Sequence, residues 1–106
     1  MNKVFESFMA PQFNQFAAYR KQLGYEPDGI RSVLLDFDRY LQKRAVPDLT
    51  HLTPAFFLKL AASIHEDPNT VNRVLSGLRA LFAFLVRQGL YTQNPLDDIP
   101  TRGQRY

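Results

Sequence analysis

The stretch "NTVNRVLSGLRALFAFLVRQ", residues 69–88, decides the fold. At about 100° of rotation per residue, its large apolar side chains fall on one side, and this pattern predicts an amphipathic helix. Burying such a face is worth on the order of 1.5–3 kcal/mol per large side chain, so the helix belongs to the core. The predicted core face consists of Val71, Val74, Leu75, Leu78, Leu81, Phe82 and Leu85.

The opposite face of this helix, called the basic strip below, joins small residues with arginines and contains no acid. Short side chains let a helix axis approach a partner closely, and guanidinium groups bind phosphates or guanine edges. The helix N-terminus beside Thr70 is a further anion site. Packing against another helix, with ordinary surface arginines, explains the same pattern. The basic strip consists of Asn69, Asn72, Arg73, Ser76, Arg79, Ala80, Ala83 and Arg87.

Helical periodicity predicts four helices in all, three of them before residue 67, separated by short breaks. The first begins near Ala10 and ends before Gly24, which suits a C-terminal cap. The third begins at the Thr53-Pro54 cap pair. The fourth begins at Asp67-Pro68 and ends near Gln88, with Gly89 directly after it. No strand alternation is present, so the chain is expected to be all-α.

The second predicted helix has Asp28 as its N-cap and places Ile30, Val33, Leu34, Phe37, Tyr40 and Leu41 on its apolar face. Of its outward residues, Arg31 and Ser32 in the first turn are candidates to reach a DNA backbone. Arg39 is expected to pair weakly with Asp36, three residues earlier. The predicted outward side consists of Arg31, Ser32, Leu35, Asp38, Arg39 and Gln42.

Composition limits the possible classes of protein. The 106 residues suffice for one small domain, and 45% hydrophobic content with nine Phe fits an ordered core. Cysteine is absent, which excludes disulfides and thiolate sites and fits a reducing cytosol. The N-terminus lacks the features of a secretory signal, and arginines interrupt the longest apolar run, so we expect a cytoplasmic protein without a membrane span. The net charge of +3 is compatible with nucleic acid but is too small to indicate it alone.

The segment from Thr70 to Pro95 resembles the last helix and exit turn of the core-binding, SAM-like N-terminal domain of tyrosine recombinases, the phage integrase family. The ordered set that carries the resemblance is Thr70, Arg73, Leu75-Ser76, Leu78-Arg79, Phe82, Leu85, Gly89 and Asn94-Pro95. The resemblance implies a single four- to five-helix orthogonal bundle over residues 1–96, followed over residues 97–106 by the start of a linker. It also implies that the second and fourth helices face duplex DNA.

The resemblance implies DNA-binding roles for nine residues. Gly29 and Val33 stand where the family often has Thr and Tyr, so the second-helix contacts depart from the family pattern. The implied set is Thr70, Arg73, Ser76 and Arg79, then Asn69, Asn72 and Arg87, and finally Arg31 and Ser32.

The family's catalytic residues lie in a separate C-terminal domain, so this chain is expected to catalyse nothing. Tyr106 lacks the arginines and histidines that activate a scissile phosphate, and Asp97-Asp98 is expected to be a solvated turn. With two histidines and no cysteine, no metal or other cofactor is predicted. The implied partners are duplex DNA, a C-terminal catalytic domain in the parent chain, and other recombinase subunits in a tetramer.

Two alternatives remain from the residues alone. One is a helical protein–protein interaction module, in which the basic strip is a docking groove. The other is a free-standing DNA-binding regulator, which requires the reading frame to stop near Tyr106.

Overall fold

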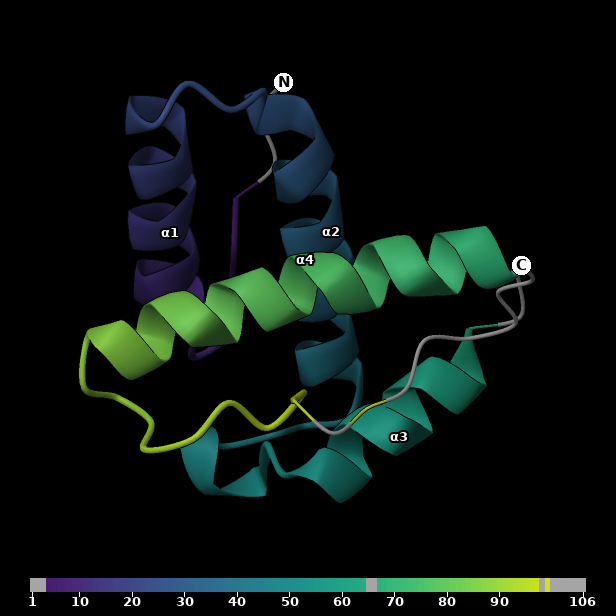
Figure 1. The fold of residues 1–106 in the computed structure, drawn as a ribbon. Helices are drawn as coiled ribbons and strands as arrows, with labels where there is room; N and C mark the ends of the chain where they lie inside the picture. The colour runs from purple at the N-terminus through teal and green to yellow at the C-terminus, as the bar shows by residue number, and fades with distance from the viewer. Residues whose placement is uncertain (1–3, 65–66, 98, 100–106) are drawn as a thin grey trace. The chain divides into compact units, whose positions relative to one another are not determined.

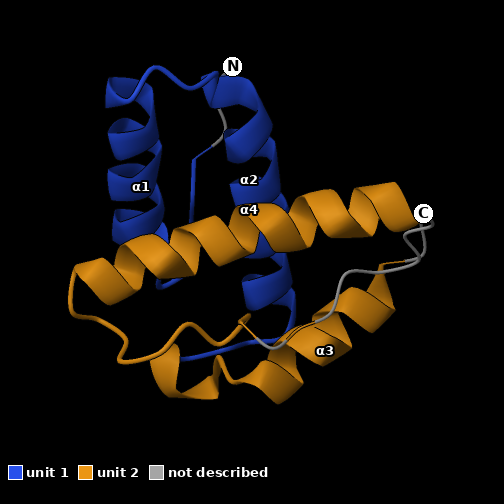
Figure 2. Ribbon diagram, viewed as in Figure 1, with its two compact units in different colours: residues 1–48 blue, residues 49–106 orange. Residues whose placement is uncertain are grey.

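In the structure of the chain, a computed structural model, residues 4–64, 67–97 and 99 are described. These residues form four α-helices and one short 3₁₀ helix and contain no strand, which confirms the all-α class. No helix among them has the length and apolar character needed to cross a bilayer. The chain divides into two compact units, Met1–Asp48 and Leu49–Tyr106, and each is described by itself (Figure 2).

The first unit is a helical hairpin in which α1 (Ala10–Gln22) and α2 (Pro27–Lys43) lie side by side and run in opposite directions (Figure 1). The ring of Phe13 packs edge-on against Phe5 at 5.2 Å between centroids and contacts Phe37 at 5.9 Å. The aromatic cluster therefore joins the N-terminal segment to both helices.

Each helix of the hairpin ends in a left-handed residue that redirects the chain. Gly24 has φ +90°, and the next amide, Tyr25 N–H, donates to the carbonyl of Arg20, as in a Schellman cap. The second helix ends in the same way at Ala45, with φ +54° and the amide of Val46 donating to the carbonyl of Leu41. An alanine therefore occupies a position that favours glycine.

The predicted N-cap of α2 was wrong by two residues. Glu26 is the N-cap, and its Oε1 accepts a hydrogen bond from the backbone N–H of Asp28 at 3.0 Å. Pro27 follows at the first helical position, where its missing N–H costs nothing. Asp28 therefore lies inside the first turn, where its charge complements the helix dipole.

The predicted outward position of Asp38 was also wrong, since its side chain is only 2% exposed. Its two carboxylate oxygens accept hydrogen bonds from the backbone N–H groups of Glu6 at 3.0 Å and Ser7 at 2.9 Å. The side-chain amide of Gln42 donates to the same carboxylate at 2.9 Å. Asp38 thus fixes the N-terminal segment onto α2, and the predicted pair of Arg39 with Asp36 is present at 3.5 Å.

The second unit contains η1 (Leu49–His51), α3 (Pro54–Ser63) and α4 (Pro68–Arg87). Both α-helices begin as predicted. Thr53 Oγ1 accepts from the backbone N–H of Phe56 at 3.3 Å, and Asp67 Oδ1 accepts from that of Thr70 at 2.9 Å. The rings of Phe57 on α3 and Phe82 on α4 meet edge-on at 5.3 Å.

The core face predicted for α4 is confirmed, because all seven of its residues are buried. Phe84 is buried as well, at a position close to the basic strip on the helical wheel. On α2, five of the six predicted apolar positions are buried and Tyr40 is half-buried.

After α4 the chain folds back along the helix, in a stretch called the return segment, which comprises residues 88–97 and 99 (Figure 1). It begins with a Schellman cap at Gly89, φ +85°, in which Leu90 N–H donates to the carbonyl of Leu85. Leu96 and Ile99 are both buried, so packing extends to Ile99. Of the linker predicted over residues 97–106, only Asp97 and Ile99 belong to the described part of the chain. The other residues, among them Asp98 and Tyr106, lie outside it.

Candidate nucleic-acid interface

The basic strip lies along α4 in the second unit, and four of its polar members are exposed to solvent. Asn72, Ala80 and Ala83 are half-buried, as is the neighbouring Thr70. From Asn69 to Leu96 the chain carries no Asp or Glu, so within this segment no acid neutralises the arginines. The exposed polar members are Asn69, Arg73, Ser76 and Arg87.

Arg79, which the sequence pattern places at the edge of the strip, directs two of its guanidinium N–H groups at backbone carbonyls of the return segment. Its Nε donates to the carbonyl oxygen of Leu96 at 3.3 Å, and its Nη2 donates to that of Ile99 at 3.0 Å. On the helical wheel Arg79 stands about 80° from Asn69, at the edge of the strip nearest Phe82. The return segment passes that edge, which is why this arginine is half-buried.

The N-terminus of α4 already has a negative partner. The carboxylate of Asp67 accepts the amide hydrogen of Thr70, one of the donors that the first turn leaves without a helical partner. An incoming anion at this end would therefore meet a carboxylate. This contact weakens the expectation of an anion site beside Thr70.

The second-helix candidates lie in the first unit, on the first turns of α2. The guanidinium of Arg31 stacks over the Phe5 ring, 4.9 Å from its centroid, and Ser32 beside it is exposed. Both line a shallow depression of about 240 Å³ together with Asp28, Leu35 and Arg39. The depression combines two cations with one carboxylate, so it is less positive than the basic strip.

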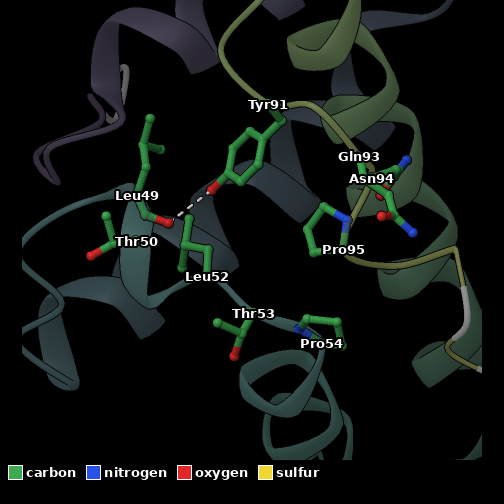
Figure 3. Close-up of a pocket in the computed structure, with 9 residues that line it drawn as sticks. All are labelled: Leu49, Thr50, Leu52, Thr53, Pro54, Tyr91, Gln93, Asn94 and Pro95. Atoms are coloured by element: carbon green, nitrogen blue, oxygen red, sulfur yellow. Dashed lines mark hydrogen bonds between the residues drawn. The ribbon is translucent and has the colours of Figure 1, made fainter.

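A second concave site forms where the return segment meets η1 and the start of α3 (Figure 3). Tyr91 is one of its lining residues, with its hydroxyl donating to the carbonyl of Leu49 at 3.2 Å and its ring against Phe82 at 5.0 Å between centroids. Burial raises the pKa of the Tyr91 phenol well above its ordinary value. The pocket, of about 330 Å³, is lined by Leu49, Thr50, Leu52, Thr53, Pro54, Tyr91, Gln93, Asn94 and Pro95.

Asn94 is the residue of this region whose role the sequence pattern did not reveal. Its side chain is 9% exposed, its Nδ2 donates to the carbonyl of Arg79 at 2.9 Å, and its Oδ1 accepts from the amide of Leu96 at 3.0 Å. An Asn-Pro pair after a helix cap is ordinarily a turn signal. The available clue was that Asn, unlike most turn residues, offers a donor and an acceptor at once.

Residues 30–89 match the family model of the phage integrase N-terminal SAM-like domain. The matched range includes parts of both units and contains Arg31, Ser32 and the complete basic strip. The chain is also similar to the tyrosine recombinase XerC of Alcanivorax borkumensis, with 45% identity over 51 residues. That alignment covers 43% of this chain and 17% of the relative. No solved structure matches the chain significantly.

Proposed function

The chain belongs to the phage integrase N-terminal SAM-like domain family, and from that membership we propose that it binds duplex DNA at the core site of a tyrosine recombinase. In this proposal the chain grips the DNA while a C-terminal catalytic domain of the parent protein exchanges the strands. The chain itself catalyses no reaction. Other recombinase subunits on the same DNA are its proposed protein partners.

The observation that carries the proposal is the exposed, acid-free face of α4. Arg73 and Arg87 are both exposed and are separated by 14 helical positions, which corresponds to about 21 Å along the axis. That length exceeds the roughly 12 Å width of the major groove. The two arginines can therefore reach phosphates on opposite sides of a groove.

The residues between these arginines suit the same placement. Ser76, Ala80 and Ala83 project little from the helix, so the backbone of α4 can approach the DNA closely. Asn69 and Ser76, both exposed, supply hydrogen bonds to phosphate or base edges. Such contacts position the helix, while the arginines supply most of the salt-dependent attraction.

The first turns of α2 are a second proposed contact. Ser32 is exposed, and the stacking of Arg31 on Phe5 holds its guanidinium near the surface of the first unit. We assign these two residues to the DNA backbone, because guanidinium and hydroxyl groups donate to phosphate oxygens. The carboxylate of Asp28 in the same depression opposes an incoming phosphate, so this contact contributes less than the basic strip. Phosphate contacts of this kind set register without reading sequence.

An amide NMR titration of the chain with short duplex DNA, at low and at high salt, tests the proposal. We expect shifts concentrated on Asn69 to Arg87 and at the start of α2, and their loss at high salt. If the basic strip does not shift at low salt, even with the recombination site of the parent protein, DNA binding is excluded. Shifts on the strip with a protein partner instead, insensitive to replacing Arg73 by Ala, would establish the interaction module.

A further inference from the structure

We propose that Arg79 is a positioning residue, which holds the return segment against α4 and so fixes the position of Ile99 relative to that helix. It does so through its guanidinium, which is directed at two backbone carbonyls instead of at a phosphate. The claim that this anchoring sets a position relative to DNA rests on the proposed DNA-binding role of α4. The positioning itself is a property of the chain without DNA.

The first argument is the geometry of the guanidinium. Its Nε–H and Nη2–H are fixed in one plane and reach two different carbonyl oxygens, those of Leu96 and Ile99, three residues apart. A lysine ammonium keeps the charge but lacks this rigid fork. Hydrogen bonds from a charged donor are also stronger than those between neutral groups. One side chain therefore anchors two successive points of the return segment.

The second argument is that the return segment is anchored to the same residue a second time. The side-chain amide of Asn94 donates to the backbone carbonyl of Arg79, while its oxygen accepts from the amide of Leu96. Arg79 thus bonds the segment through its side chain, and its own carbonyl is bonded in return. Leu96, 0% exposed, and Ile99, 5% exposed, bury their side chains between these anchors.

The consequence concerns the path of the chain. Ser76 lies one turn before Arg79 on α4 and is exposed on the face that we propose contacts DNA. Because Arg79 bonds the carbonyl of Ile99, the backbone at Ile99 has a fixed position relative to that face. A domain attached there would start from a defined position over the DNA instead of a variable one. Arg79 is thereby removed from the phosphate contacts that the family resemblance implies.

Hydrogen exchange on the free chain tests the anchoring. The amides of Leu96 and Ile99 donate to Asn94 Oδ1 and to the Leu96 carbonyl, so their protection reports the ordered segment. We expect Arg79→Lys to accelerate both exchange rates at least about tenfold, with the rate of Leu78 in the core of α4 unchanged. Arg73→Lys, the matched exposed arginine, should change none of them. Unchanged rates at Leu96 and Ile99 in Arg79→Lys would overturn the proposal.

A distance measurement separates positioning from stability. The chain has no cysteine, so Asp97→Cys, an exposed position, accepts a single nitroxide label. We expect the label to broaden amide signals of α4 around Ser76–Ala80, and Arg79→Lys to spread that broadening over other residues. Asp38→Asn, which disrupts buried hydrogen bonds of the first unit, should leave the pattern intact. An identical pattern in Arg79→Lys would contradict the inference.

The Nε–H signal of Arg79 in the unaltered chain shows what DNA does to this contact. During titration with short duplex DNA at low salt, we expect the Arg73 signal to move and the Arg79 signal to stay. Movement of the Arg79 signal together with loss of Ile99 protection would make it a phosphate contact and refute the proposal. If neither arginine moves, the DNA-binding function fails, and the exchange and label measurements still decide the anchoring.

Discussion

The backbone N–H of Ser7 donates to Oδ1 of Asp38 at 2.9 Å, across 31 positions of the chain. The neighbouring amide of Glu6 donates to the second oxygen of the same carboxylate. A helix residue therefore satisfies the backbone of a segment that has no secondary structure of its own. This bond places Phe5 where its ring meets Phe13 and supports the guanidinium of Arg31.

We expect Asp38→Asn to lower the free energy of unfolding by about 1–3 kcal/mol, because an amide group can accept only one of the two backbone hydrogens and turns a donor toward the other. Urea denaturation followed by circular dichroism measures the change. Asp36→Asn is the control, since Asp36 is exposed and its ion pair with Arg39 contributes little. Equal losses in the two variants would show that the buried carboxylate has no special role.

Replacing Ala45 by Gly should stabilise the chain by about 1 kcal/mol, because Ala45 has φ +54° and only glycine adopts that conformation without strain. The reverse change at the corresponding cap of α4, Gly89→Ala, should destabilise by a similar amount. No atom lies within 4 Å of a methyl group built on Gly89, so the cost there is that of the backbone alone. Thermal unfolding of both variants checks the pair. A lower melting temperature for Ala45→Gly would refute the argument from strain.

Tyr91→Phe should cost about 0.5–1.5 kcal/mol near neutral pH, because it removes the hydroxyl that donates to the Leu49 carbonyl. The substitution should also change the pH dependence of stability. Burial raises the pKa of Tyr91 in the folded chain above the value of about 10 in the unfolded one. The stability linked to the neutral phenol is therefore complete below pH 10 and lost as the pH rises above it.

Denaturation midpoints measured between about pH 9 and pH 11.5 check this sign. The unaltered chain should lose stability more steeply than Tyr91→Phe above pH 10, and the two should run parallel below it. Because lysines and the other tyrosines titrate in both proteins, only the difference between them is diagnostic. Parallel curves throughout the range would mean that Tyr91 titrates as an exposed tyrosine does.

Arg73→Ala and Arg87→Ala should each weaken DNA binding and reduce the salt dependence of the association constant. In a plot of the logarithm of the association constant against the logarithm of the salt concentration, the slope should decrease in magnitude by about 0.9 for each lost phosphate contact. Fluorescence anisotropy with labelled duplex at several salt concentrations measures the slope. Lys59→Ala removes an equal charge from an exposed position on α3 and should leave the slope unchanged. A uniform reduction in all three variants would indicate net charge rather than contacts.

The helices were predictable because their signals are local. The caps at Thr53 and Asp67, the left-handed glycines at 24 and 89, and the core face of α4 each depend on residues within about four positions of one another. The same is true of the basic strip, whose small residues and arginines follow from the helical period. Family membership was likewise accessible, because an ordered set of such local features survives in one segment.

The misplaced residues, by contrast, have partners far along the chain. The helical pattern predicted an outward position for Asp38, because its side chain is polar. In the structure, backbone N–H groups 31 and 32 positions away donate to its buried carboxylate. The same periodicity made Arg79 a surface cation, although carbonyls 17 and 20 residues later accept its hydrogens.

The sequence by itself therefore determined the four helices, most of their ends and most of the apolar residues that they bury, because these depend on backbone sterics and side-chain spacing within a few turns. Only the tertiary structure decided which polar side chains on those helices remain available to a ligand. Every backbone donor and acceptor that folding removes from water needs a partner, and in this chain Asp38 and Arg79 bond backbone groups of segments outside the helices.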